Sequence, residues 1–146
     1  MSFECEQSVN VATERDVVWR LLIDASTWKT WWSDCVDATA ADRRTLHEGS
    51  KLELALQPKQ LKYTFYPEVD LTSEGKSLSL THRSLFVQWT VSWFLQDLET
   101  GTRVTARGSF AGLGTLLPRI FHQDDTARFS LNSNLRGLKR LAERMV

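Results

Sequence analysis

A chain of 146 residues, 42% apolar and 25% charged, has the size and composition of one globular domain, so we expect a single domain over residues 1–146. Eighteen basic side chains balance eighteen acidic ones, which argues against nucleic acid or an anionic membrane as a partner. No apolar run reaches the ~20 residues of a membrane helix, and the N-terminus lacks a signal-peptide pattern. We therefore expect no stable membrane association. Cys5 and Cys35 match no metal or redox spacing, so we expect reduced thiols and a cytoplasmic location.

The first elements are a strand and two short helices. Polar and apolar residues alternate over residues 3–11, which predicts a half-buried strand. Thr13 is expected to cap the element that follows, where apolar residues recurring at helical spacing predict a helix from about Glu14 to Asp24. A second short helix, from Ser26 to Trp32, carries three tryptophans.

Strand follows strand from Val36 to Phe110, with turn signals at residues 47–50, 57–59, 73–76 and 99–101. These short connections leave no room for crossover helices, so the sheet is predicted to be antiparallel. The residues expected to face inward are Leu52, Leu54, Leu56, Leu61, Tyr63, Phe65, Val69, Leu71, Leu78, Leu80, His82, Val87, Trp89, Val91, Trp93, Leu95, Val104, Ala106, Gly108 and Phe110. Because the opposite face is mostly polar, the inward face needs a cover.

The last element, from about Thr115 to Met145, is a long helix with an apolar stripe that can supply this cover. Gly137 in its interior predicts a kink or a close approach to the sheet. The predicted fold class is therefore α+β, with a seven-stranded curved antiparallel sheet wrapped around a long C-terminal helix.

Three stretches of sequence resemble the START-like superfamily (SRPBCC), also called the helix-grip or polyketide cyclase and pollen-allergen fold. The first runs from Ala12 through Trp19 to Leu22, Asp24, Trp28, Trp31 and Val36, the second is Gly101 to Thr105, and the third is Leu135 to Glu143. The resemblance implies an apolar cavity between the concave sheet and the last helix. Different members use that cavity to carry lipids, sterols or plant hormones or to cyclise polyketides, and others bind protein partners.

The inward aromatic residues are the candidates for lining such a cavity. A buried indole needs a partner for its N–H, which a ligand, a water or a backbone carbonyl can supply, although plain core packing is the alternative for each tryptophan. The predicted ligand-binding residues are Trp28, Tyr63, Phe65, His82, Trp89, Trp93, Phe110, Leu117, Phe121 and Leu131. Trp31 is interpreted as structural.

Few side chains in the predicted cavity could do chemistry. His82 is a candidate general acid or base, and the alternative is a core histidine bonded to backbone or to Tyr63. Tyr63 and Gln7 could orient the polar end of a ligand. His122, Asp124 and Asp125 lack further ligands at metal-site spacing, and no phosphate-binding or nucleophile motif is present, so we expect neither metal nor cofactor.

Three functions fit these observations. The first is binding of a hydrophobic or aromatic small molecule, as a carrier or sensor. The second is a cyclase or dehydratase-like enzyme, in which His82 would act with Tyr63 or Ser84. The third is a protein-interaction or chaperone-cofactor role, suggested by the outward aromatics Tyr66, Phe86 and Phe94, with a homodimer as its milder version.

Overall fold

The computed structural model describes residues 2–57, 62–84, 87–112 and 124–145. The chain begins with β1 (Ser2–Val11), α1 (Arg15–Ile23), the 3₁₀ turn η1 (Ala25–Thr27) and α2 (Trp28–Trp31). The strands that follow are β2 (Cys35–Ala40), β3 (Leu52–Leu56), β4 (Tyr63–Phe65), β5 (Glu68–Ser73), β6 (Ser77–Arg83), β7 (Val87–Leu98) and β8 (Gly101–Gly112). The last described element is α4 (Asp124–Arg144).

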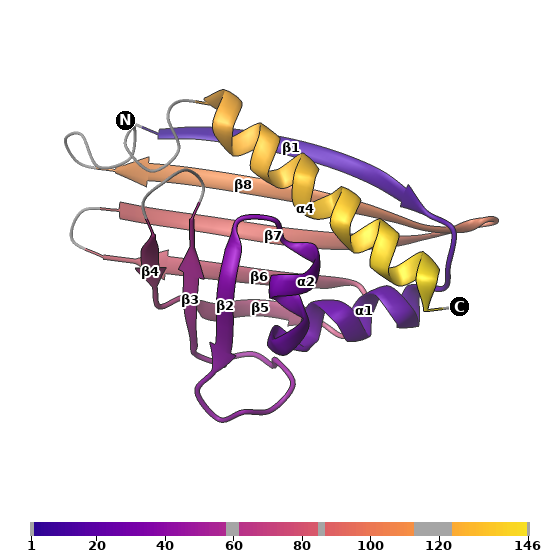
Figure 1. Ribbon diagram of the computed structural model, residues 1–146, viewed down its shortest axis with the longest axis horizontal. Helices are drawn as coiled ribbons and strands as arrows, with labels where there is room; N and C mark the ends of the chain where they lie inside the picture. Colours follow the sequence, from indigo (N-terminus) through magenta and orange to yellow (C-terminus); the bar gives the residue numbers. More distant parts are fainter. Residues whose placement is uncertain (1, 58–61, 85–86, 113–123, 146) are drawn as a thin grey trace.

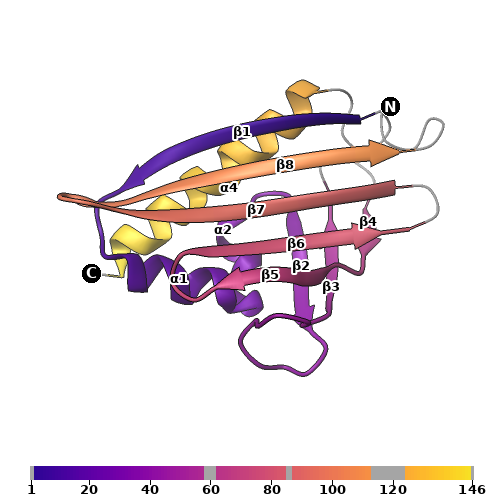
Figure 2. The ribbon, with the colours of Figure 1, turned by 180° about the vertical axis from the view of Figure 1, so that it is seen from behind.

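The eight described strands form two antiparallel sheets rather than one sheet of seven. The larger has the order β1-β8-β7-β6-β5 and the smaller the order β2-β3-β4 (Figures 1 and 2). The strand predicted around residues 61–71 divides into β4 and β5, which belong to different sheets. Pro67 stands between them, and because proline has no N–H to donate, a continuous ladder is interrupted there.

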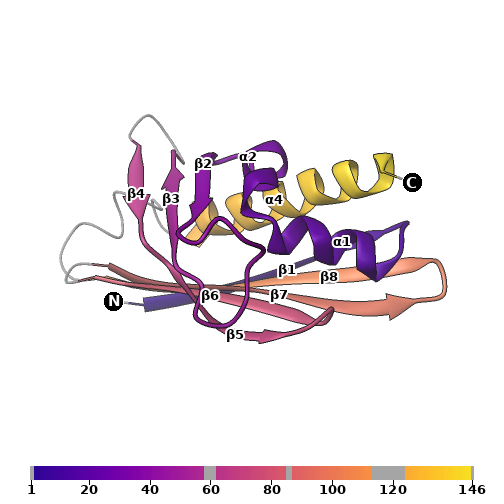
Figure 3. The same ribbon diagram turned by 90° about the horizontal axis from the view of Figure 1, so that it is seen from below.

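All the described helices and the smaller sheet lie on the same side of the five-stranded sheet (Figure 3). α4 packs against β1, β8 and α2, and α1 lies beside the ends of β7 and β8 that their hairpin turn joins. The predicted inward residues of β6, β7 and β8 are buried, and most residues between them are not. The period-two pattern thus correctly predicted the covered face of these strands.

Leu71 is the exception among the described inward predictions, since 62% of its surface is exposed. The pairing of β5 with β6 shifts register between Val69 and Leu71. A bulge at this point places an extra residue in β5, and the alternation beyond it reverses. Val69 is accordingly buried, as predicted, while Leu71 faces solvent.

The close approach predicted at Gly137 exists, but it is made to α2 and not to the sheet. A Cβ built on Gly137 would lie 2.0 Å from the carbonyl oxygen of Trp31, so any larger residue would collide with the backbone of α2. Beside this contact, the hydroxyls of Ser33 and Ser133 share a hydrogen bond of 2.7 Å. α4 and the end of α2 are therefore in direct backbone contact.

The C-terminal end of α4 is fastened to the end of β1. The Ala12 N–H donates to Glu143 Oε2 at 2.7 Å, and Lys139 Nζ donates to the Asn10 carbonyl at 2.9 Å. Lys139 and Glu143 also pair with each other at 2.6 Å. Both belong to the Leu135–Glu143 stretch that resembles the superfamily, which gives that motif a structural role.

None of the helices in the described residues combines the length and apolar character needed to cross a bilayer.

Candidate ligand-binding site

Four tryptophans meet beneath α4, at the centre of the covered face. The rings of Trp28, Trp31, Trp32 and Trp93 contact one another with centroids 5.6–6.1 Å apart. Trp28 Nε1 donates to the Leu22 carbonyl and Trp31 Nε1 to the Thr27 hydroxyl, each at 3.0 Å. Both indoles are thereby satisfied within the core. For Trp28, predicted to bind ligand, this leaves no spare polar atom.

Other polar atoms in this region have no partner. The Nε1 atoms of Trp32 and Trp93, and both amide atoms of Asn134, are buried without a hydrogen bond to any described residue. Asn134 is fully buried on α4, on the same stripe as Leu131, Leu135 and Leu138. An unpartnered buried donor or acceptor costs about 1–3 kcal/mol, so such groups call for a partner beyond the described residues.

A second aromatic group lies where β4 of the smaller sheet meets β6 and β7. The Phe65 ring makes edge contacts with His82 and Trp89, with centroids 4.9 and 5.5 Å away, and Tyr63 stacks on Phe65 at 6.3 Å. His82 and Trp89 are paired across β6 and β7 and stack at 5.7 Å. Trp89 Nε1 is buried and lacks a partner in the described chain. Four of the predicted ligand-binding residues therefore form one contiguous aromatic group.

His82 is neutral and oriented by backbone. The Tyr66 N–H donates to Nδ1 at 3.2 Å, which requires Nδ1 to be unprotonated and leaves the ring proton on Nε2. Burial lowers the pKa of His82 below its usual value. Within the described residues neither Tyr63 nor Ser84 bonds to the ring; the Ser84 hydroxyl instead donates to the Val87 carbonyl.

The remaining predicted residues divide by position. Phe110 is buried and pairs with Trp89 across β8 and β7, and Leu131 is buried on α4. Gln7 is half-buried on β1. Leu117 and Phe121 lie outside the described residues, as do Phe86 and His122.

Trp32 and Asn134 were not among the sequence candidates. Asn134 falls three residues after Leu131 and four before Leu138, so a polar residue on an apolar helical stripe was a readable signal. The missing partners of both side chains become evident only in the folded chain. Burial raises the pKa of the Cys35 thiol to about 12, which keeps this free cysteine protonated and unreactive.

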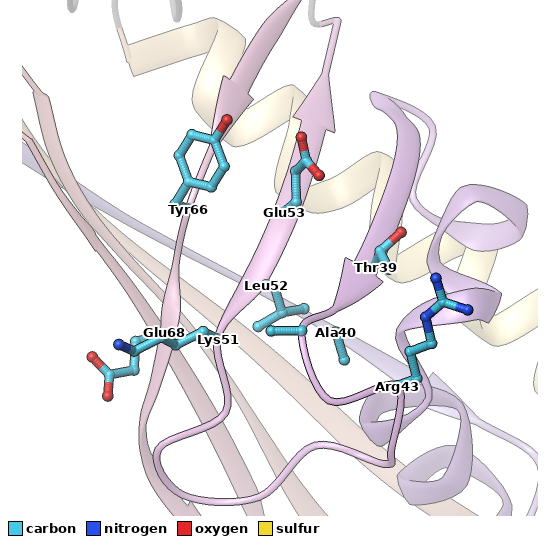
Figure 4. A pocket seen from close by; sticks show the side chains of 9 residues that line it. Thr39, Ala40, Arg43, Lys51, Leu52, Glu53, Tyr66 and Glu68 are labelled. Carbon is cyan, nitrogen blue, oxygen red and sulfur yellow. The ribbon is translucent and has the colours of Figure 1, made fainter.

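Two surface pockets of about 500 and 520 Å³ lie beside β2, and no ring of the two aromatic groups lines either of them. The two pockets share Thr39, Ala40 and Arg43. Figure 4 shows the first pocket, in which Tyr66 and Glu53 lie on the side opposite Arg43. Charged residues of both signs line the two pockets, and neither contains a predicted ligand-binding residue.

The sequence and structure can now be compared with known proteins. A family model described as Activator of Hsp90 ATPase homolog 1-like protein matches residues 12–143. The chain belongs to this family. The family is part of the SRPBCC or helix-grip superfamily, so the resemblance found in the sequence is confirmed.

Solved structures share the fold of this Activator of Hsp90 ATPase homolog 1-like chain at low sequence identity. A protein of Thermus thermophilus has a TM-score of 0.78 at 13% identity, covering 99% of each chain. One from Nitrosomonas europaea scores 0.76 at 20% identity, covering 97% of this chain and 95% of that one. The Zhui aromatase/cyclase of Streptomyces sp. R1128 scores 0.75 at 16% identity, covering 99% and 95%. The sequence matches no curated protein.

Proposed function

We propose that this protein binds a hydrophobic or aromatic small molecule between the five-stranded sheet and α4. The observation that carries the proposal is the unpartnered, buried N–H of Trp89 within the aromatic group of Tyr63, Phe65 and His82. Apolar walls with a few well-placed polar groups are typical of small-molecule sites. Lipids are among the ligands that such a wall could accept.

The apolar contacts would supply most of the affinity. Burying ~200 Å² of ligand surface contributes about 5 kcal/mol at ~25 cal/mol per Å², before the cost of association. A hydrogen bond from Trp89 Nε1 would add about 1 kcal/mol and fix the orientation of the ligand. The aromatic wall therefore accounts for binding, and the indole N–H for selectivity.

A polyketide cyclase-like activity is the second candidate, and the neutral, buried imidazole of His82 favours it. The Zhui protein is described as an aromatase/cyclase, with the same fold at 16% identity. Catalysis would ask for a second polar side chain within hydrogen-bond reach of His82. Among the described residues the ring is bonded by the Tyr66 backbone rather than by a side chain, which is why we rank binding first.

A protein-interaction role has less support. Tyr66 and Phe94 are 66% and 38% exposed, as predicted. Tyr66 lines the charged pocket beside β2 and β3, whereas Phe94 lies on β7 under the guanidinium of Arg107, 5.1 Å away. The two aromatics thus have separate, polar surroundings. A single domain, a cytoplasmic location and a homodimer remain predictions.

Tryptophan-fluorescence titration with the uncharged probe N-phenyl-1-naphthylamine tests binding. We expect saturable quenching, weakened severalfold by Trp89→Phe, which keeps an aromatic ring but removes the N–H donor. Phe94→Leu, on the opposite side of β7, is the control and should leave the titration unchanged. Absence of saturation, or equal weakening by the two variants, would contradict the proposal.

Native mass spectrometry of protein purified from its host distinguishes binding from catalysis. A retained molecule whose mass is unchanged after incubation supports a carrier or sensor. A changed mass supports the enzyme, and His82→Gln should then abolish the change while the molecule still binds.

A further inference from the structure

Asn134 lies beside the contact between α4 and α2. Its neighbour Ser133 bonds to Ser33, and Gly137, one turn further along α4, touches the backbone of Trp31. At 100° per residue, Asn134 projects from the inner side of this contact, where its side chain is fully buried. The amide therefore lies beside the Ser33–Ser133 hydrogen bond and the Gly137–Trp31 backbone contact, while both its polar atoms lack a described partner.

Two more unpartnered donors belong to the same region. The Trp32 and Trp93 rings meet edge to face, with centroids 5.7 Å apart, and neither Nε1 has a partner among the described residues. Trp32 directly precedes Ser33, the residue that bonds to α4 beside Asn134. The α2–α4 contact thus brings three side chains with unused hydrogen-bonding capacity into one neighbourhood.

These side chains offer an unequal set of donors and acceptors. An amide and two indoles together provide four N–H hydrogens and one carbonyl oxygen. The buried side chains of residues 4–57, 62–84, 87–111 and 131–145 include no Lys, Arg, Asp or Glu. A ligand that satisfies this set must supply acceptors and carry no charge, because neither sign would find a counter-ion.

We propose that Asn134, Trp32 and Trp93 form the deep polar end of the binding site and select uncharged ligands that carry a carbonyl oxygen. This inference rests on the proposed binding function. A carbonyl oxygen accepts two hydrogen bonds, so it can pair with the Asn134 amide and one indole together. An ammonium group would bring further donors to a region that already has an excess, and a carboxylate would bring a buried charge.

A matched set of naphthalene probes tests the selection by isothermal titration. The probes are 2-acetylnaphthalene, the nearly isosteric hydrocarbon 2-isopropenylnaphthalene, 1-(2-naphthyl)ethylamine and 2-naphthoic acid. We expect the ketone to bind about tenfold more tightly than the hydrocarbon, and the amine and the acid to bind more weakly than the ketone. Asn134→Leu should reduce the ketone preference to about one while leaving hydrocarbon binding intact.

Asn132→Leu is the matched control, because this asparagine is half-buried two positions away on α4 and should not affect the preference. Trp32→Phe is a second variant, expected to lower the preference for the ketone over the hydrocarbon severalfold. It provides the test if Asn134→Leu fails to fold. Equal affinity of the wild type for ketone and hydrocarbon would overturn the inference, as would equal loss of both probes in Asn134→Leu. Failure of every probe to bind the wild type would instead refute the binding function itself.

Discussion

Replacing Gly137 with alanine tests whether the backbone contact between α4 and α2 is as close as described. The new Cβ would lie 2.0 Å from the Trp31 carbonyl oxygen, more than 1 Å short of the ~3.3 Å at which carbon and oxygen normally touch. Because the collision is with backbone, no side-chain rotation relieves it, and α4 must move away from α2. That movement would also strain the Ser33–Ser133 hydrogen bond.

Two opposing effects set the magnitude. Alanine is favoured over glycine inside a helix by about 1 kcal/mol, which alone would stabilise the protein. Overpacking of a rigid contact costs up to about 3 kcal/mol. We therefore expect the free energy of unfolding to fall by about 2 kcal/mol, which lowers the melting temperature by roughly 4–8 °C in a chain of this length.

Urea denaturation followed by tryptophan fluorescence measures this change. Arg136→Ala, at the exposed neighbouring position, is the control and should shift stability by less than about 0.5 kcal/mol. A Gly137→Ala variant as stable as the wild type, or more stable, would show that helix propensity decides and that the close approach is not required.

Three further predictions concern single side chains. Asn134→Leu should raise the free energy of unfolding of the ligand-free protein by about 1 kcal/mol, since it removes unpartnered buried polar atoms. Calorimetry that shows a lower free energy of unfolding would mean that the Asn134 amide has hydrogen-bond partners. The pKa of His82 is lowered in the folded chain, so its contribution to stability is complete above about pH 6.5 and declines as pH falls towards the folded pKa; His82→Phe should flatten this part of a stability–pH curve. The bonds of Glu143 with Lys139 and the Ala12 N–H lower the pKa of that carboxyl, so its contribution is present above about pH 4.5 and lost below it. Glu143→Gln should cost about 1 kcal/mol at pH 7 by urea titration, and no change would indicate that these bonds exchange freely with water.

The sequence predicted the element types and most inward faces. Side chains in a strand alternate between its two faces, and the apolar residues identify which of the two faces is buried. This succeeded throughout β7, where Val87, Trp89, Val91, Trp93 and Leu95 are all buried. It failed where the backbone departs from regular pairing. The break at Pro67 sends β4 and β5 to different sheets, and the bulge after Val69 reverses the orientation of Leu71.

The candidate site was predicted in part, for a related reason. Tyr63, Phe65, His82 and Trp89 come together because all four sit on inward faces of strands that the fold brings into contact. The sequence could not predict that the amide of Asn134 lacks hydrogen-bond partners among the described residues. Whether a buried amide has a partner depends on what other elements place beside it, and periodicity contains no such information.

The pairing of β1 with β8 governs how this chain can fold. Ser8 and Thr105, which share a hydrogen bond across these strands, are separated by 97 residues in the sequence. Closing so long a loop is slow, because its entropic cost precedes the contacts that reward it. During synthesis the edge of β1 that pairs with β8 stays open until β8 has left the ribosome, and α4 can cover these strands only after that. A nascent chain stalled before residue 101 would expose that edge to other chains, so conditions that slow translation should favour aggregation of this protein.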